Sequence, residues 1–157
     1  MCRLCDNPNA DGDAEDDLDG LRSAIRDHLW VVKCVPDERR PYAYTLGLHE
    51  LGLPELLATG VTTDRALALM DYFAPEVIQN GPPAPGDRIA MSEIAMFEAV
   101  QVDQPDVHME LGTMLFGPKL RAVQLVWTDM RGRWPWDATF DYYGMKQPVL
   151  GVRAAAA

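Results

Sequence analysis

Apolar residues recur at helical spacing near the start of the chain and predict an amphipathic helix there. Asp16 or Asp17 is placed to cap the amino end of this helix, because a short carboxylate accepts the free backbone N–H groups of a first turn. The positions that form the apolar stripe are Leu18, Leu21, Ile25 and Leu29.

A second stripe at helical spacing follows in the middle of the chain. It predicts a helix that begins at Thr62 or Thr63, either of which can serve as the amino-terminal cap. Pro75 lies inside this helix and predicts a bend or an interruption, since proline has no N–H to donate. The stripe consists of Leu67, Met70, Phe73 and Val77.

Short apolar and β-branched runs predict strands elsewhere. Residues 30–35 and 42–48 read as a hairpin joined by a charged turn. Further strands are expected at 88–94, 97–102 and 122–127, and short helices at 54–60, opened by Pro54, and at 107–116.

The order of these elements predicts an α+β fold. Strands occur consecutively as well as between helices, so the chain does not repeat regular parallel βαβ units. We expect a single domain over residues 17–153, with a mostly antiparallel sheet packed against three or four helices. Residues 1–16 form an acidic amino-terminal arm, and residues 154–157 are expected to be a cloning remnant or a tail.

Charge narrows the classes of partner. The chain has 157 residues, 24 of them acidic and 14 basic, for a net charge of -10. A negative surface disfavours nucleic acid and anionic membranes as main partners. No apolar run is long enough for a membrane span, and the amino end lacks the features of a signal peptide, so we expect a cytoplasmic protein.

Cys2 and Cys5 form a Cys-x-x-Cys pair, which can chelate a metal, cycle between dithiol and disulfide, or have no chemical role. A zinc or iron site needs further ligands, for which the candidates are His28, His49, His108 and Cys34. Two amino-terminal pairs could also complete a site across a homodimer. The surrounding carboxylates oppose a thiolate of lowered pKa, so metal binding is favoured over redox catalysis. Cys34 itself is expected to be a small buried apolar residue.

A second candidate site is basic and aromatic. If the two segments that carry it are adjacent, guanidinium groups beside aromatic faces form a pocket for an anionic or planar small ligand. The alternative is that the aromatic rings are packing residues and the arginines are solvated. The residues are Arg39, Arg40, Tyr42 and Tyr44 on the hairpin and Arg131, Arg133, Trp134 and Trp136 on a late loop.

Three motifs together resemble a bacterial family known as domain of unknown function 4262. They are the segment 42–48 (YAYTLGL), the segment 53–56 (LPEL) with Thr59-Gly60, and the segment 124–129 (QLVWTD) running into 132–137 (GRWPWD). The start of the chain and the ending at 147–151 are similar to the actinobacterial branch. One departure is Leu29, where the family usually has glycine between a histidine and a tryptophan. The resemblance implies no established activity, substrate or catalytic residue.

Two functions therefore follow from the sequence. The first is a small binding or interaction protein, expected to be a homo-oligomer, whose basic and aromatic loops recognise a small ligand or a protein. The second is a metal-dependent or thiol-dependent enzyme built around Cys2 and Cys5. The motifs of serine hydrolases, Walker-type phosphate loops and dinucleotide-binding loops do not occur in the chain.

Overall fold

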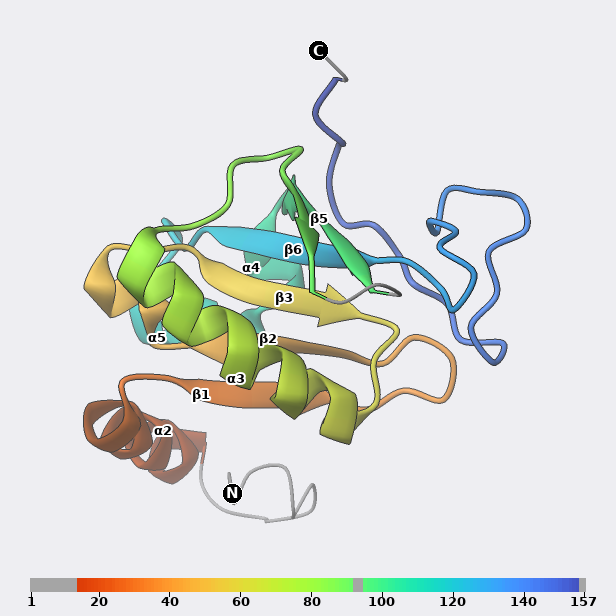
Figure 1. Ribbon diagram of the computed structural model, residues 1–157. Helices are drawn as coiled ribbons and strands as arrows, with labels where there is room; N and C mark the ends of the chain where they lie inside the picture. The colour runs from red at the N-terminus through yellow and green to blue at the C-terminus, as the bar shows by residue number, and fades with distance from the viewer. Residues whose placement is uncertain (1–13, 92–94, 156–157) are drawn as a thin grey trace.

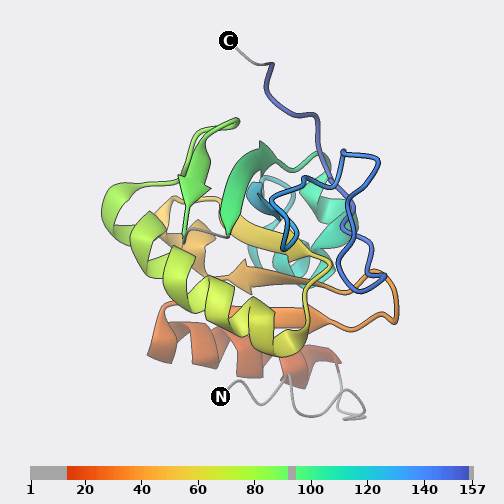
Figure 2. The same cartoon turned by 45° about the vertical axis from the view of Figure 1, so that its right-hand side comes forward.

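One six-stranded sheet organises the molecule in the computed structural model, which describes residues 14–91 and 95–155 (Figures 1 and 2). The strand order is β1-β2-β3-β6-β5-β4. Every pairing is antiparallel except that of β3 with β6. The expected single α+β domain with a mostly antiparallel sheet is confirmed.

Four α-helices lie among the described residues, together with one short 3₁₀ helix. The helices are α2 (Ala14–His28), α3 (Thr63–Asn80), α4 (Pro105–His108) and α5 (Glu110–Phe116), and the 3₁₀ helix η1 is Leu48–Leu51. The strands are β1 (Val31–Val35), β2 (Tyr42–Leu46), β3 (Glu55–Thr59), β4 (Arg88–Ala90), β5 (Met96–Gln101) and β6 (Ala122–Trp127). None of the helices in these ranges is long and apolar enough to span a lipid bilayer.

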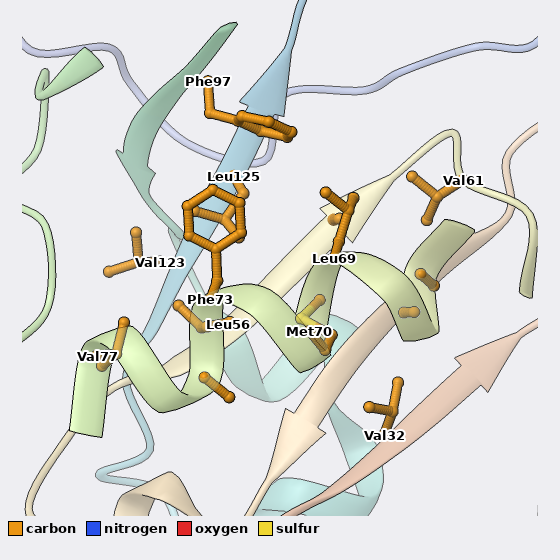
Figure 3. Packing of buried hydrophobic residues seen from close by; sticks show 14 of the residues in the cluster. Val32, Leu56, Val61, Leu69, Met70, Phe73, Val77, Phe97, Val123 and Leu125 are labelled. Atoms are coloured by element: carbon orange, nitrogen blue, oxygen red, sulfur yellow. The ribbon is translucent and has the colours of Figure 1, made fainter. Parts of the chain in front are cut away.

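The two faces of the sheet carry different layers, because successive side chains of a strand point to opposite faces. On β3, Leu56 and Ala58 join the hydrophobic cluster under α3, whereas Leu57 joins the cluster on the other face. Helix α3 presents Met70 and Phe73 to the first face, as Figure 3 shows. The second face is covered by α2, by α4 and α5, and by the segment that follows β6.

The segment expected to be a short helix at 54–60 is a strand instead. Residues of β3 are buried on both faces, and the strand lies between β2 and β6. Its leucine and alanine content favours a helix locally, but five residues are too few to stabilise a helix, and pairing on both edges supplies the backbone with partners. The tertiary context therefore overrides the local propensity.

Other boundaries differ from the expected ones. Helix α2 already contains Asp16 and Asp17, so neither caps it. Thr62 does cap α3, and the helix continues through the exposed Pro75 without interruption. The helix expected at 107–116 is divided into α4 and α5 at Met109, and residues 92–94 of the expected strand at 88–94 lie outside the described residues.

Leu29 occupies a left-handed conformation, with φ of 70°, directly after α2. This is the helix-terminating position that glycine favours, and it is where the chain departs from the resembled family. We predict that Leu29→Gly raises the free energy of unfolding by about 1 kcal/mol, because the strain at Cβ disappears. Urea unfolding measures this change in the free energy of unfolding. Leu29→Ala is the control: it keeps Cβ and should give no gain, since the leucine side chain is 55% exposed and contributes little packing.

Candidate functional site

Three strands end at the same edge of the sheet. Because β1 and β3 both run antiparallel to β2, and β3 runs parallel to β6, their carboxyl ends lie together at Val35, Thr59 and Trp127. The amino end of α3 follows β3 at the same edge. The segment after β6, which starts at residue 128 and which we call the late loop, also begins there (right-hand side of Figure 1). Crevices outside the carboxyl ends of parallel strands, beside a helix amino end, are common ligand sites in sheet proteins.

A pocket of about 200 Å³ lies at this edge; we call it the Cys34 pocket. Its wall on α3 includes Thr62, Thr63 and Ala66, and Met145 comes from the late loop. The side chain of Thr62 accepts a hydrogen bond from Arg65 N at 3.4 Å. The remaining lining residues are Cys34, Val35, Pro36, Asp37, Pro41, Tyr42, Ala43 and Val61.

The turn between β1 and β2 is fixed by Asp37. Its Oδ1 accepts hydrogen bonds from Arg39 N at 2.8 Å and from Arg40 N at 2.7 Å. These backbone donors, Arg39 first, and the nearby charge of Arg40 lower the pKa of the Asp37 carboxyl below its usual value. The pocket therefore has one ionised carboxylate in its wall, already held by the backbone.

The late loop is attached to this edge by backbone contacts. Lys146 N donates to Arg39 O at 2.9 Å, so the loop reaches the turn between β1 and β2. Gln147 uses its amide twice, accepting from Trp127 N and donating to Trp127 O, both at 2.9 Å. A Cβ at Gly60 would lie 2.8 Å from Lys146 O, and its φ is 70°, so glycine is required for this close approach.

Arg65 lies in an aromatic clamp on the same helix turn. The guanidinium carbon is 4.1 Å from the ring centroid of Trp127 and 4.7 Å from that of Tyr142. The two rings meet edge to face at 4.8 Å. Nη1 of Arg65 is buried and has no hydrogen-bond partner among the described residues. We call this group, Arg65 with Trp127 and Tyr142, the Arg65 clamp.

Asp129 organises the first part of the late loop. Its Oδ1 accepts from Arg131 N and Arg133 N at 2.8 and 2.9 Å, and its Oδ2 accepts from Arg133 Nε and Asp141 N at 2.8 and 3.2 Å. Burial alone would raise the pKa of this carboxyl, but the hydrogen bonds outweigh it and lower the pKa to about 2. Both oxygens of this carboxylate thus already accept hydrogen bonds, so Asp129 has a structural role.

Glu55 is a second buried carboxylate, at the opposite end of β3. It accepts from Thr45 Oγ1 at 2.6 Å and from three backbone N–H groups, those of Gly47, Leu48 and His49, at 2.8 to 3.3 Å. Burial raises the pKa of this carboxyl, while the hydrogen bonds oppose the increase. Because its donors surround it and the side chain is fully buried, we read Glu55 as a structural residue that fixes the loop after β2.

The structure divides the predicted basic and aromatic set between two clusters. The rings of Tyr42 and Tyr44 stack with centroids 6.2 Å apart, and both belong to the cluster that contains residues of α2 and α5. Tyr42 Oη donates to His108 O at 3.0 Å. Burial raises the pKa of the Tyr44 hydroxyl. Of this set, Tyr42 also lines the Cys34 pocket.

Trp134 and Trp136 lie in another cluster, where they stack on each other with centroids 5.1 Å apart. Arg153 covers Trp136 at 3.5 Å and Arg88 covers Trp134 at 4.8 Å, and both arginines bind the carboxylate of Glu98. The tryptophans are thus engaged in attaching the carboxy-terminal segment to the sheet.

The predicted arginines have different environments. Arg133 forms an ion pair with Asp129. The backbone N–H of Arg131 donates to the same carboxylate, and Arg131 is exposed. Arg39 and Arg40 are exposed in the turn beside the Cys34 pocket. Of the predicted set, therefore, only Tyr42 lines the pocket.

The predicted metal ligands are separate in the described part of the chain. His28 is exposed at the carboxyl end of α2, His49 stacks on Phe116 at 5.2 Å, and His108 lies in α4. In residues 14–91 and 95–155 no group of three or more histidine, cysteine or acidic side chains could hold a metal ion. Cys2 and Cys5 lie outside the described residues, and a site that they complete stays a prediction.

Sequence reasoning missed Arg65, Glu55 and Asp129. Arg65 stands three residues after the cap of α3, where a long side chain can reach back over the helix end, but the rings that clamp it are about 60 and 80 residues away in sequence. Glu55 was assigned to a helix. Cys34, expected to be a small core residue, is partly buried and lines the pocket.

These features define an α+β protein of one domain with a small open pocket between the turn that joins β1 to β2 and the amino end of α3. The chain belongs to the family described as Domain of unknown function (DUF4262), whose model matches residues 24–141. Searches of curated proteins and of solved structures give no significant match. The pocket residues lie within the matched range except for Met145.

Proposed function

We propose that this protein binds a small molecule in the Cys34 pocket. The observation that carries the proposal is the pocket itself, about 200 Å³ in volume, which lies between the turn that joins β1 to β2, the amino end of α3 and Met145. A cavity of about 150 Å³ with apolar walls holds a benzene molecule, so the volume suits a ligand with one ring.

The chemistry of the wall supports a ligand with an apolar body and a polar end. Val35, Val61 and Ala66 supply apolar surface. Thr62, Thr63 and Asp37 are polar residues with hydroxyl or carboxylate groups in this wall. A few polar groups among apolar ones are typical of small-molecule sites, where they orient the ligand.

A second pocket, of about 210 Å³, lies at the other end of α3 between Tyr72, Phe73 and the prolines of the connector at 82–83. Its polar side chains are Glu76 and Asn80, and these bind each other at 3.1 Å. We favour the Cys34 pocket because Thr62 and Thr63, at the amino end of α3, form part of its wall.

Closing the pocket with a large side chain tests the proposal. Thr63 is exposed at the first position of α3, so Thr63→Phe fills the pocket with little cost to stability. In a thermal-shift screen of one-ring compounds, we expect ligands that raise the melting temperature of the wild type to lose their effect in Thr63→Phe.

The matched control is Ala68→Phe, which adds the same side chain at an exposed position of α3 that does not line the pocket. It should respond to ligands as the wild type does. Ligands that stabilise Thr63→Phe and the wild type equally would contradict binding in this pocket.

A further inference from the structure

We infer that the Cys34 pocket selects small cations that carry N–H donors, such as aromatic amidines, through the carboxylate of Asp37. The inference rests on the proposed function, since it specifies the ligand class of the same site. It starts from the charge of the pocket wall. Among the described residues that line the pocket, Asp37 is the one whose side chain is acidic or basic.

The carboxylate of Asp37 keeps acceptor capacity for a ligand. Its Oδ1 accepts from Arg39 N and Arg40 N, whereas its Oδ2 has no hydrogen bond and the side chain has no ion pair among the described residues. An ionised carboxylate accepts at about four lone-pair positions, so the turn uses two of them. The backbone donors that lower the pKa of Asp37, Arg39 first, keep the carboxylate ionised at neutral pH.

The same part of the wall offers few donors to an anion. The two backbone N–H groups of the turn already donate to Asp37. Pro36 and Pro41 line the pocket and have no N–H, and the N–H of the nearby Gly60 donates to Pro41 O at 2.6 Å. Acceptors therefore outnumber available donors beside Asp37, which favours a ligand that donates.

The amino end of α3 belongs to the same wall, and its partial positive charge by itself favours an anion. This charge is equivalent to about half an elementary charge. Two features of the helix reduce its effect: the side chain of Thr62 accepts the N–H of Arg65, and Asp64 is an acidic residue of the first turn. The full negative charge of Asp37 therefore exceeds what remains of the helix dipole at the pocket.

Other charges near the turn have mixed signs and do not line the pocket. They are the exposed residues Glu38, Arg39, Arg40 and Lys146. Salt screens exposed charges in water, whereas a charge in the wall lies within reach of the ligand. Over the whole chain the net charge is -10, and a negative protein attracts cations from solution.

The test compares benzamidine, benzamide and benzoate by calorimetric titration at neutral pH and constant ionic strength. The three compounds have nearly the same shape and carry a positive charge, no charge and a negative charge. We expect the wild type to bind benzamidine most tightly and benzoate least. Asp37→Asn keeps a side-chain oxygen for the turn and removes the charge. It should weaken benzamidine binding by about fivefold, the effect of an ion pair open to water, and change benzamide binding little.

The matched control is Glu38→Gln, which removes the same charge from an exposed neighbour that does not line the pocket and should bind all three compounds like the wild type. Equal benzamidine affinity in the wild type and Asp37→Asn, an equal loss in Glu38→Gln, or no benzamidine binding by the wild type would overturn the inference. In each case, benzamide binding that Thr63→Phe abolishes would leave the proposed function standing. Benzamide that binds Thr63→Phe as tightly as the wild type would contradict the proposed function as well.

Discussion

Glu55→Ala is expected to lower the free energy of unfolding by about 4 kcal/mol, because several buried donors lose their acceptor at once. Thr45 Oγ1 and the backbone N–H groups of Gly47 and His49 all converge on this carboxylate. Total stabilities of single domains are about 5–15 kcal/mol, so the variant should be close to unfolding. Urea unfolding followed by circular dichroism measures the difference. The matched control is Glu50→Ala, an exposed glutamate of the same segment, which should change stability by less than about 0.5 kcal/mol.

The contribution of Glu55 to the free energy of unfolding should change with pH in a definite direction. Burial raises the folded-state pKa of Glu55 above 4.5, the value of an unperturbed glutamate. The protonated form is then the one that folding favours, so the contribution is fully present below pH 4.5 and declines as the pH rises through the folded-state pKa. The difference in stability between the wild type and Glu55→Gln should therefore shift against the wild type as the pH rises from about 4.5. A difference that is flat with pH would contradict a burial-raised pKa.

Asp129→Ala is expected to lower the free energy of unfolding by about 3 kcal/mol, since Arg133 loses its partner and three backbone N–H groups lose their acceptor. The donors are the side chain of Arg133 and the backbone of Arg131, Arg133 and Asp141. Hydrogen exchange should show loss of protection at those amides. Asp71→Ala, an exposed aspartate of α3, is the control and should be nearly neutral.

Acid should remove the stabilisation by Asp129 over a narrow range of pH. Its folded-state pKa is about 2, below the usual value of 3.8. The stabilisation is therefore present above pH 3.8 and is lost as the pH falls from 3.8 toward about 2. The wild type should lose stability over this range relative to Asp129→Ala. Parallel acid unfolding of the two proteins would show that the carboxylate is not held as the structure describes.

The helices and most strands could be predicted from the sequence, because each has the hydrophobic period of its type. The stripe through Met70, Phe73 and Val77 is the buried face of α3, and residues 122–127 are strand β6. The segment of β3 could not be assigned, since it is buried on both faces and alternation of apolar and polar residues is absent. One of its two partners, β6, comes from a distant part of the chain.

The site was harder to predict than the fold. The sequence predicts one basic and aromatic group, whereas the tyrosines and the tryptophans lie in two different clusters. The ring faces of Trp134 and Trp136 are covered by Arg88 and Arg153. The Arg65 clamp depends on Trp127 and Tyr142, which only the parallel pairing of β3 with β6 and the return of the late loop bring to α3. No local pattern in the sequence contains that information.

The structure gives a physical context for the sequence difference at Leu29, because this residue has a left-handed backbone conformation. A leucine with φ of 70° occupies the position where the resemblance leads us to expect glycine. Nearby, a Cβ at Gly47 would collide with the carbonyl oxygen of Leu29. The connection between α2 and β1 is thus packed against the loop that Glu55 fixes.

Backbone amide NMR of the ¹⁵N-labelled protein during titration with one-ring compounds such as benzamidine and benzamide tests the central claim most directly. The account predicts saturable shift changes at the Cys34 pocket, in residues 34–37, 41–43, 61–66 and 145. Saturable changes confined to the pocket of Tyr72 and Pro82, or none that saturate, would contradict it.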